Sequence, residues 1–186
     1  MHSARLIAVG TATRIALTPV VMWLVLNGEG NTAELIAAAL FCVAAATDWV
    51  DGRLARRWGV TSKLGSFLDT TADKLLVSGV LIALLAAGRA STWIVALIIG
   101  RELVIMGLRG AIASEGEIMA PSMLGKLKTS IQFLAIVLAI LRPGEPIGGL
   151  FLDEWVMLAA AAITLASAVD YVMRALPRLA REDDRS

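Results

Sequence analysis

The sequence is poor in the residues that build several common kinds of protein site. It has one cysteine, Cys42, and one histidine among 186 residues. A single cysteine excludes a disulfide within the chain and gives no sign of a thiolate metal site, so we interpret Cys42 as a small buried apolar residue. Charged residues make up only 18% of the chain, and the formal net charge is +1. A charge so close to neutral gives no reason to expect a nucleic-acid partner.

What the chain has in abundance is apolar residues. They account for 58% of the sequence, and the mean hydropathy is +0.75, whereas a soluble domain is ~45–50% apolar. A helix that spans a membrane needs about 20 mostly apolar residues. Six segments are candidates: residues 6–26, 33–50, 67–87, 93–113, 127–141 and 156–173. The fifth is short unless it begins near Gly125 and reaches past Arg142. We therefore predict an all-α polytopic membrane protein with six transmembrane helices in a single domain, residues 1–186.

The ends of the apolar segments support this division. Residues 27–30, Asn-Gly-Glu-Gly, follow the first segment, and residues 142–146, Arg-Pro-Gly-Glu-Pro, follow the fifth. Both stretches are typical of turns. The first segment is longer than the hydrophobic part of a signal peptide, so we expect it to be a retained helix.

Basic residues gather on one side of the predicted membrane. One side carries Arg53, Arg56, Arg57, Lys63, Lys126, Lys128, Arg174, Arg178, Arg181 and Arg185. The other side carries Glu29, Arg89, Arg142, Glu145, Asp153 and Glu154. Lys and Arg accumulate on the cytoplasmic side of membrane proteins. We therefore expect both termini in the cytoplasm, as an even number of spans requires.

Four carboxylates lie in one short stretch of this otherwise apolar chain. They belong to the pattern D-x-x-D-G-x-x-A-R-x8-G-x-x-x-D-x-x-x-D. Its members are Asp48, Asp51, Gly52, Ala55, Arg56, Gly65, Asp69 and Asp73. An unpaired carboxylate is costly to bury, and ionisable residues within membrane segments are usually functional.

The spacing of this pattern suggests a site for cations and phosphate. Asp48 and Asp51 share a helical face at the cytoplasmic end of the second segment, and Gly65, Asp69 and Asp73 share a face at the start of the third. Four carboxylates in one cavity repel one another unless cations neutralise them, and oxygen ligands suit Mg²⁺, Mn²⁺ or Ca²⁺. Arg56 suits a phosphate group. A lipid-linked diphosphate at the membrane surface fits such a site.

The complete pattern resembles the motif of the CDP-alcohol phosphatidyltransferase family. The resemblance implies a six-helix bundle that forms a homodimer and binds two divalent cations, Mg²⁺ or Mn²⁺. In the roles that it implies, Asp48, Asp51, Asp69 and Asp73 are metal ligands, and Gly52, Ala55, Arg56 and Gly65 bind the CDP-lipid. Asp73 is also implied as the general base, which removes a proton from an acceptor hydroxyl that attacks the β-phosphorus and expels CMP.

Further segments resemble the branch of this family that uses glycerol 3-phosphate, the phosphatidylglycerophosphate synthases. They are Thr13-Arg14 with Pro19, residues 68–75, Arg101-Glu102-Leu103 with Gly107-Leu108-Arg109, and residues 125–129 with Gln132. CDP-diacylglycerol is then the donor, and the products are phosphatidylglycerophosphate and CMP. Arg109, Lys126 and Lys128 would supply cations for the acceptor's phosphate on the cytoplasmic face of a bacterial inner membrane. For Arg101 and Glu102 we expect a structural ion pair.

Several alternatives remain open from the residues alone. The same chemistry could use inositol phosphate, or phosphatidylglycerol to make cardiolipin. A divalent-cation transporter would also need intramembrane carboxylates, although Gly-x-x-Ala-Arg at a fixed offset has no transport rationale. A purely structural membrane subunit is a third possibility, and Lys126 and Lys128 could simply mark the cytoplasmic boundary.

Overall fold

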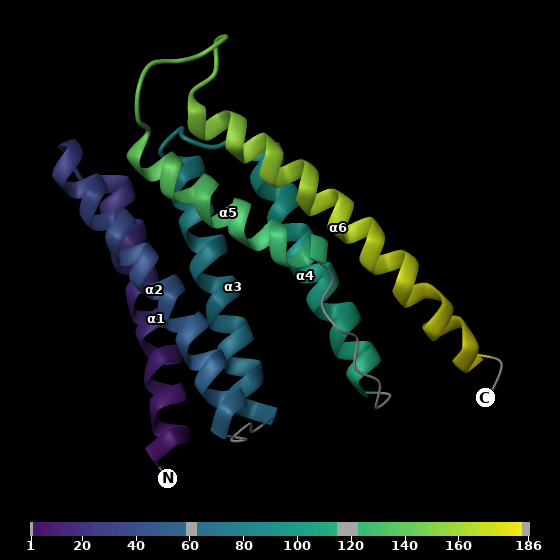
Figure 1. Ribbon diagram of the computed structural model, residues 1–186. Helices are drawn as coiled ribbons and strands as arrows, with labels where there is room; N and C mark the ends of the chain where they lie inside the picture. Colours follow the sequence, from purple (N-terminus) through teal and green to yellow (C-terminus); the bar gives the residue numbers. More distant parts are fainter. Residues whose placement is uncertain (1, 59–62, 115–122, 184–186) are drawn as a thin grey trace. The chain divides into compact units, whose positions relative to one another are not determined.

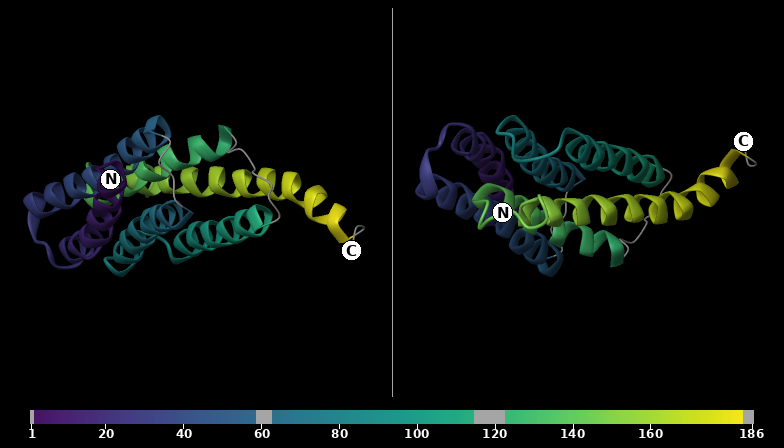
Figure 2. Two further views of the ribbon diagram at one scale, coloured as in Figure 1. Left: turned by 90° about the horizontal axis from the view of Figure 1, so that it is seen from below. Right: turned by 90° about the horizontal axis from the view of Figure 1, so that it is seen from above.

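The part of the chain that the structure describes forms six helices, consistent with the all-α prediction (Figure 1). The computed structural model describes the backbone of residues 2–58, 63–114 and 123–183, and the side chains of residues 10–47, 65, 67–114, 123–125 and 127–175. The helices are α1 (His2–Asn27), α2 (Gly30–Trp58), α3 (Lys63–Ala86), α4 (Thr92–Ser114), α5 (Met123–Leu141) and α6 (Leu152–Asp183). Figure 2 shows α6, in yellow-green to yellow, as one continuous helix.

The six apolar segments correspond to the six helices, but several helices are longer than their apolar parts. The largest differences are at α2, which continues past residue 50 to Trp58, and at α6, which starts at Leu152 and runs to Asp183. Arg53, Arg56 and Arg57 therefore lie on α2 rather than in a loop. Leu, Ala and Arg are strong helix formers, so the helix continues where the membrane-like composition stops.

The predicted turns are confirmed at both places. The first helix ends at Asn27, the backbone N–H of Gly28 donates to the carbonyl of Leu24 at 2.8 Å, and Gly30 has a φ of +77°. The fifth helix ends at Leu141 and is followed by Arg142 and Gly144, both with positive φ. Glycine adopts this conformation without a steric penalty, so the chain can reverse direction there.

The chain divides into two compact units, and the first contains α1, α2, α3 and residues 137–142. Here α1 packs against both α2 and α3. The core consists mainly of small and branched side chains, among them Val21, Ala37, Phe41, Ala44, Ala72, Leu76, Val80 and Leu84. At Gly79 on α3, an added Cβ would lie 2.9 Å from Thr18 Cγ2 and 3.0 Å from Met22 Sδ. The absence of a side chain there lets α1 and α3 approach closely.

The second unit contains residues 91–136 and 143–186. In it α4 packs against α6. Ile105 and Ile112 of α4 form a buried cluster with Tyr171 and Ala175 of α6. These pairs recur at intervals of four or seven residues, which is the spacing of one face of a helix.

The surface of the described residues is that of a membrane protein. Within the described residues, three helical stretches are long and apolar enough to cross a membrane, namely Gly30–Thr47, Met123–Leu141 and Leu152–Ala175. Large apolar side chains are exposed, for example Trp93 at 85% and Phe67 at 61%. Our expectation that Cys42 is buried is wrong: it is exposed on α2, because in a membrane helix an apolar run can face lipid as well as the core.

Candidate functional site

The carboxylate pattern is distributed over two consecutive helices of the first unit. Asp48, Asp51, Gly52, Ala55 and Arg56 lie on the last part of α2, before Trp58. Because α2 is helical throughout, these positions recur at i, i+3, i+4, i+7 and i+8 and share one helical face. Their side chains lie outside the described residues. The helical register nevertheless places all five on the same side of α2.

The other three members of the pattern lie on α3. Gly65, Asp69 and Asp73 are spaced by four residues along this helix, near its start at Lys63. The side chains of Asp69 and Asp73 are partly buried, with exposed fractions of 26% and 19%. Such positions keep carboxylate oxygens within reach of a ligand while much of the side chain is packed. The predicted clustering of these two aspartates on one face of α3 is confirmed.

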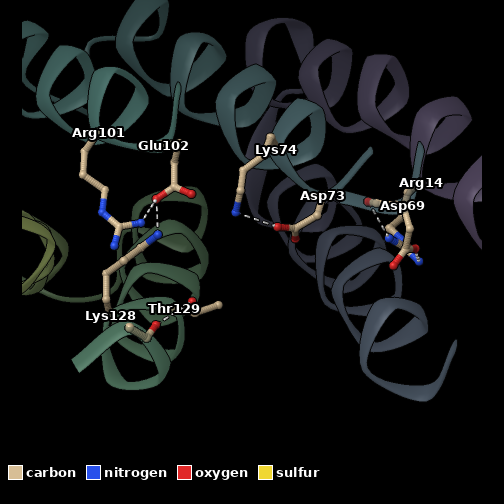
Figure 3. A network of polar contacts seen from close by, with 9 residues as sticks. Arg14, Asp69, Asp73, Lys74, Arg101, Glu102, Lys128 and Thr129 are labelled. Carbon is tan, nitrogen blue, oxygen red and sulfur yellow. Dashed lines mark hydrogen bonds and ion pairs between the residues drawn. The ribbon is translucent and has the colours of Figure 1, made fainter. Parts of the chain in front are cut away.

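Asp69 is held by an arginine from the first helix. Arg14 of α1 donates a hydrogen bond from Nη2 to Asp69 Oδ1 at 2.7 Å, and a longer one from Nη1 to the backbone carbonyl of Asp69 at 3.4 Å (Figure 3). The side chain of Arg14 is completely buried. Thr18 donates from Oγ1 to the backbone carbonyl of Arg14 at 2.8 Å. The buried guanidinium thus links α1 to the aspartate pattern.

Arg14 belongs to a segment that carries the family resemblance, but the sequence pattern predicts no role for it. Its contact with Asp69 joins residues 55 positions apart, which local spacing cannot reveal. The sequence does contain one chemical indication that Arg14 matters. A permanently charged arginine within an apolar helix needs a partner, and ionisable residues in such helices mark functional sites.

Asp73 also has a cationic neighbour. Lys74 Nζ lies 3.0 Å from Asp73 Oδ2 (Figure 3). Both side chains are partly exposed, and ion pairs in such positions contribute little to stability. The pair of Asp73 and Lys74 therefore contributes little to the stability of the fold. Asp73 remains accessible on the face of α3 that also carries Asp69 and Gly65.

The donor atoms present fit a hard divalent cation. Asp69 and Asp73 supply carboxylate oxygens, which Mg²⁺ and Mn²⁺ prefer. Among the residues whose side chains are described, no three acidic, histidine or cysteine side chains come together. Two of the four aspartates, Asp48 and Asp51, lie outside that set. Asp69 and Asp73, the described half of the predicted donor set, therefore have the ligand chemistry that such a cation prefers.

A second polar cluster lies in the second unit. Lys128 of α5 is 4% exposed and forms an ion pair with Glu102 of α4, which is equally buried. Arg101 Nη1 donates to the same Glu102 oxygen, Oε1, at 3.2 Å (Figure 3). Arg101 Nη2 donates to Ser167 Oγ of α6 at 2.8 Å. The predicted ion pair of Arg101 with Glu102 is confirmed. The cluster connects three helices through charged hydrogen bonds.

The three residues predicted for the acceptor's phosphate differ in their surroundings. Arg109 is exposed on α4, whereas Lys128 is buried against Glu102. The side chain of Lys126 lies outside the described residues, on the first turn of α5. A lysine that only marked the membrane boundary would be solvated, so the burial of Lys128 argues against that simpler interpretation.

Comparison with known proteins gives a consistent result. The model of the CDP-alcohol phosphatidyltransferase family matches residues 5–170. A CDP-diacylglycerol–glycerol-3-phosphate 3-phosphatidyltransferase of Bacillus subtilis (strain 168) is 40% identical over 176 residues, which cover 87% of this chain and 90% of the relative. Relatives with the same name are 40% identical over 148 residues in Sodalis glossinidius and 37% identical over 142 residues in Salmonella typhimurium. These alignments cover 77% and 74% of this chain, and 80% and 72% of the relatives.

Proposed function

The chain belongs to the CDP-alcohol phosphatidyltransferase family, and we propose that it transfers the phosphatidyl group of CDP-diacylglycerol to glycerol 3-phosphate. The products are phosphatidylglycerophosphate and CMP, and the role is in phospholipid biosynthesis. The observation that carries the proposal is the complete aspartate pattern on one face of α2 and one face of α3. The choice of acceptor is supported by relatives named for glycerol 3-phosphate that align with most of the chain.

In this proposal the four aspartates hold the divalent cations that the family uses. Asp48 and Asp51 on α2, with Asp69 and Asp73 on α3, would bind two ions, Mg²⁺ or Mn²⁺. When bound, such ions neutralise the diphosphate and stabilise the charge that develops on the leaving group. Asp69 and Asp73 support this role because their carboxylates are partly exposed and lie one helical turn apart.

The other residues of the pattern bind the CDP-lipid. Arg56 provides a planar cation with several donors for the diphosphate. Gly52, Ala55 and Gly65 share helical faces with the aspartates, and their small size leaves room for the nucleotide close to the backbone. The register of α2 supports this assignment because Gly52, Ala55 and Arg56 fall on the same face as Asp48 and Asp51.

Asp73 serves as the general base. Its carboxylate takes the proton from the acceptor's hydroxyl, whose oxygen forms a bond to the β-phosphorus of the CDP-lipid. The bond from that phosphorus to the bridging oxygen breaks, and the oxygen leaves as part of CMP. A base must come within hydrogen-bonding distance of the proton that it removes. The partial exposure of Asp73 supports access by an incoming hydroxyl.

Arg109, Lys126 and Lys128 bind the phosphate of glycerol 3-phosphate. Hydrogen bonds between a cation and phosphate are stronger than neutral ones. Lys128 is paired with buried Glu102 in the structure, so in this proposal it would bind the phosphate by exchanging that partner. The exposed guanidinium of Arg109 is available to a water-soluble acceptor.

The six helices would span a bacterial inner membrane with both termini in the cytoplasm, and two copies would form a homodimer. Each helix has at least 19 residues, about the length that a span requires. The distribution of Lys and Arg supports this orientation, which places the active site on the cytoplasmic side.

The test is CMP release from CDP-diacylglycerol by the purified protein with Mg²⁺ or Mn²⁺. The acceptors offered are glycerol 3-phosphate, inositol phosphate, serine and phosphatidylglycerol. We expect CMP release above the level without acceptor only when glycerol 3-phosphate is present. If CMP release depends on another acceptor, the reaction class stands and the proposed acceptor is wrong. If CMP is released with none of the four acceptors, the proposal is contradicted.

A further inference from the structure

Arg14 is the one buried cation that contacts the aspartate pattern among the described side chains. It lies on α1, outside the pattern, and both of its described hydrogen bonds to Asp69 come from the tip of the guanidinium. We propose that Arg14 is a positioning residue for the cation site, which holds Asp69 so that the other carboxylate oxygen, Oδ2, faces the metal. This inference rests on the proposed function, which assigns Asp69 to the metal.

The two described hydrogen bonds from Arg14 to Asp69 act on different parts of that residue. One fixes a side-chain oxygen of Asp69 at 2.7 Å, and the other reaches its backbone carbonyl at 3.4 Å. Together they restrain the rotation of the carboxylate relative to α3. A carboxylate has enough lone pairs to accept a hydrogen bond on one oxygen and to coordinate a metal ion with the other.

Arg14 stays with Asp69 when a cation binds. Its side chain is completely buried, and separating a buried charge from an oppositely charged neighbour is unfavourable. The close packing of α1 on α3 at Gly79 and the hydrogen bond from Thr18 to the carbonyl of Arg14 fix the part of α1 that carries it. Arg14 is thus a permanent neighbour of the ligand rather than a counter-ion that the metal displaces.

Two effects of changing Arg14 on metal binding have opposite signs. Removal of its positive charge would favour a nearby cation, whereas loss of the hydrogen bonds would let Asp69 turn away. Arg14→Lys distinguishes the two effects. Lysine keeps the positive charge but lacks the planar, forked guanidinium that makes both contacts with Asp69. Residues that orient a metal ligand typically contribute about 10–100-fold to metal affinity.

Arg89 provides a matched control in the same unit. Its Nη1 donates to the backbone carbonyl of Ile140 at 2.6 Å, and its Nη2 donates to Glu34 Oε1 at 2.5 Å. It therefore contacts one carbonyl and one carboxylate, as Arg14 does. Arg89 lies just beyond the C-terminal end of α3. At 1.5 Å per residue, that end of the helix is about 26 Å from Asp69. Arg89→Lys repeats the chemical change without touching the aspartates.

The experiment is a titration of the full-length protein in detergent with Mn²⁺ alone, in which electron paramagnetic resonance measures free Mn²⁺. We expect R14K to bind Mn²⁺ about 10–100-fold more weakly than the unchanged protein, and R89K to bind it equally well. Because Arg14 acts through Asp69, R14K combined with Asp69→Asn should bind no more weakly than Asp69→Asn alone.

The possible outcomes separate this inference from the proposed function. If Asp69→Asn weakens Mn²⁺ binding and R14K does not, the positioning role is wrong and the metal assignment stands. If Asp69→Asn itself binds Mn²⁺ like the unchanged protein, the metal assignment fails. Equal weakening in R14K and R89K would indicate a general effect on the fold and would overturn the positioning role.

A measurement on the unchanged protein covers the case in which R14K does not fold. Hydrogen exchange of the backbone amides is compared with and without Mn²⁺. We expect Mn²⁺ to slow exchange in α1 around Arg14 and Thr18 as well as in α3, because Arg14 couples the two helices. Slower exchange confined to α2 and α3 would contradict the inference.

Discussion

Asp69 and Asp73 are one helical turn apart, yet their immediate surroundings differ. Asp69 accepts a hydrogen bond from a fully buried arginine on another helix, whereas Asp73 is paired with its sequence neighbour Lys74 on the same helix. A carboxylate that is held firmly suits a metal ligand, and one with a weaker, partly exposed partner suits proton transfer. These surroundings fit the proposal that Asp73 has a task beyond metal binding, whereas Asp69 is a metal ligand alone.

Asp73→Asn tests the proposed general base. We expect kcat for CMP release at saturating Mn²⁺ to fall about 10²–10⁴-fold, which is the usual contribution of a general base. Thr71→Ala is the control, since Thr71 is exposed on the same helix and donates only to Phe67 of its own helix among the hydrogen bonds described. Full turnover by Asp73→Asn would rule out this role for Asp73.

Arg109→Gln tests the acceptor site. Because a hydrogen bond to a charged group contributes about 1.5–3 kcal/mol, we expect KM for glycerol 3-phosphate to rise roughly 10–150-fold while KM for CDP-diacylglycerol stays unchanged. Arg174→Gln on α6 removes another exposed arginine and should leave both values unchanged. Equal changes in both KM values for Arg109→Gln would argue against a role specific to the acceptor.

At the scale of helices, residue composition predicted the number and order of the elements, but not all of their ends. The expected end of α2 followed from the apolar length of a membrane span, whereas the helix itself continues to Trp58 through residues with high helix propensity. The contacts of Arg14 with Asp69 and of Lys128 with Glu102 join residues far apart in the chain. Such pairs depend on packing between helices, which spacing within one helix does not specify.

Glu102 illustrates how charge links the helices of the second unit. Its carboxylate accepts hydrogen bonds from two cations, Arg101 and Lys128, and all three side chains are largely buried. We expect Glu102→Gln to lower the free energy of unfolding by about 3–5 kcal/mol, because two buried cations lose their common anion. Thermal unfolding in detergent measures the effect.

Glu34→Gln serves as the control for this substitution. Glu34 pairs with Arg89 at 2.5 Å, but both side chains are about a quarter exposed. An ion pair in contact with solvent contributes about 0–1 kcal/mol, so this variant should unfold close to the unchanged protein. Similar losses in the two variants would show that burial is not what makes Glu102 important.

Gly79 tests the close approach of α1 and α3. Alanine generally stabilises a helix relative to glycine by about 1 kcal/mol, and Gly100→Ala should do so because nothing lies within 4 Å of the added carbon. Gly79→Ala should instead destabilise by about 1–3 kcal/mol, since its Cβ meets the stiff side chain of Thr18 at 2.9 Å. A gain in unfolding temperature for Gly79→Ala would show that the two helices can separate freely.

For the whole molecule, the proposed orientation determines which substrates can reach the site. Glycerol 3-phosphate is soluble in water and CDP-diacylglycerol lies in the membrane, so the aspartates must be at a surface where both are present. The pattern spans the last part of α2 and the first part of α3. Basic residues before, within and after this region predict that the surface is cytoplasmic.

Cysteine labelling tests this orientation. Cys42 is the only cysteine, so Cys42→Ser gives a background without thiols, into which Glu145→Cys or Arg174→Cys is introduced. Both positions are exposed. We expect a membrane-impermeant maleimide added to cells with a permeabilised outer membrane to label the cysteine at position 145, and to label position 174 only after the inner membrane is broken. The reverse pattern would place the termini outside.

The most direct measurement follows labelled glycerol 3-phosphate into lipid. The purified protein is reconstituted with CDP-diacylglycerol, and radioactive phosphatidylglycerophosphate is quantified with Mn²⁺ and after chelation. We predict labelled product together with an equal amount of CMP, loss of both after chelation, and little of either with Asp69→Asn or Asp73→Asn. Labelled lipid formed at the same rate by these variants, or the absence of labelled lipid from the unchanged protein with Mn²⁺, would contradict the assignment of this reaction to the aspartates of α2 and α3.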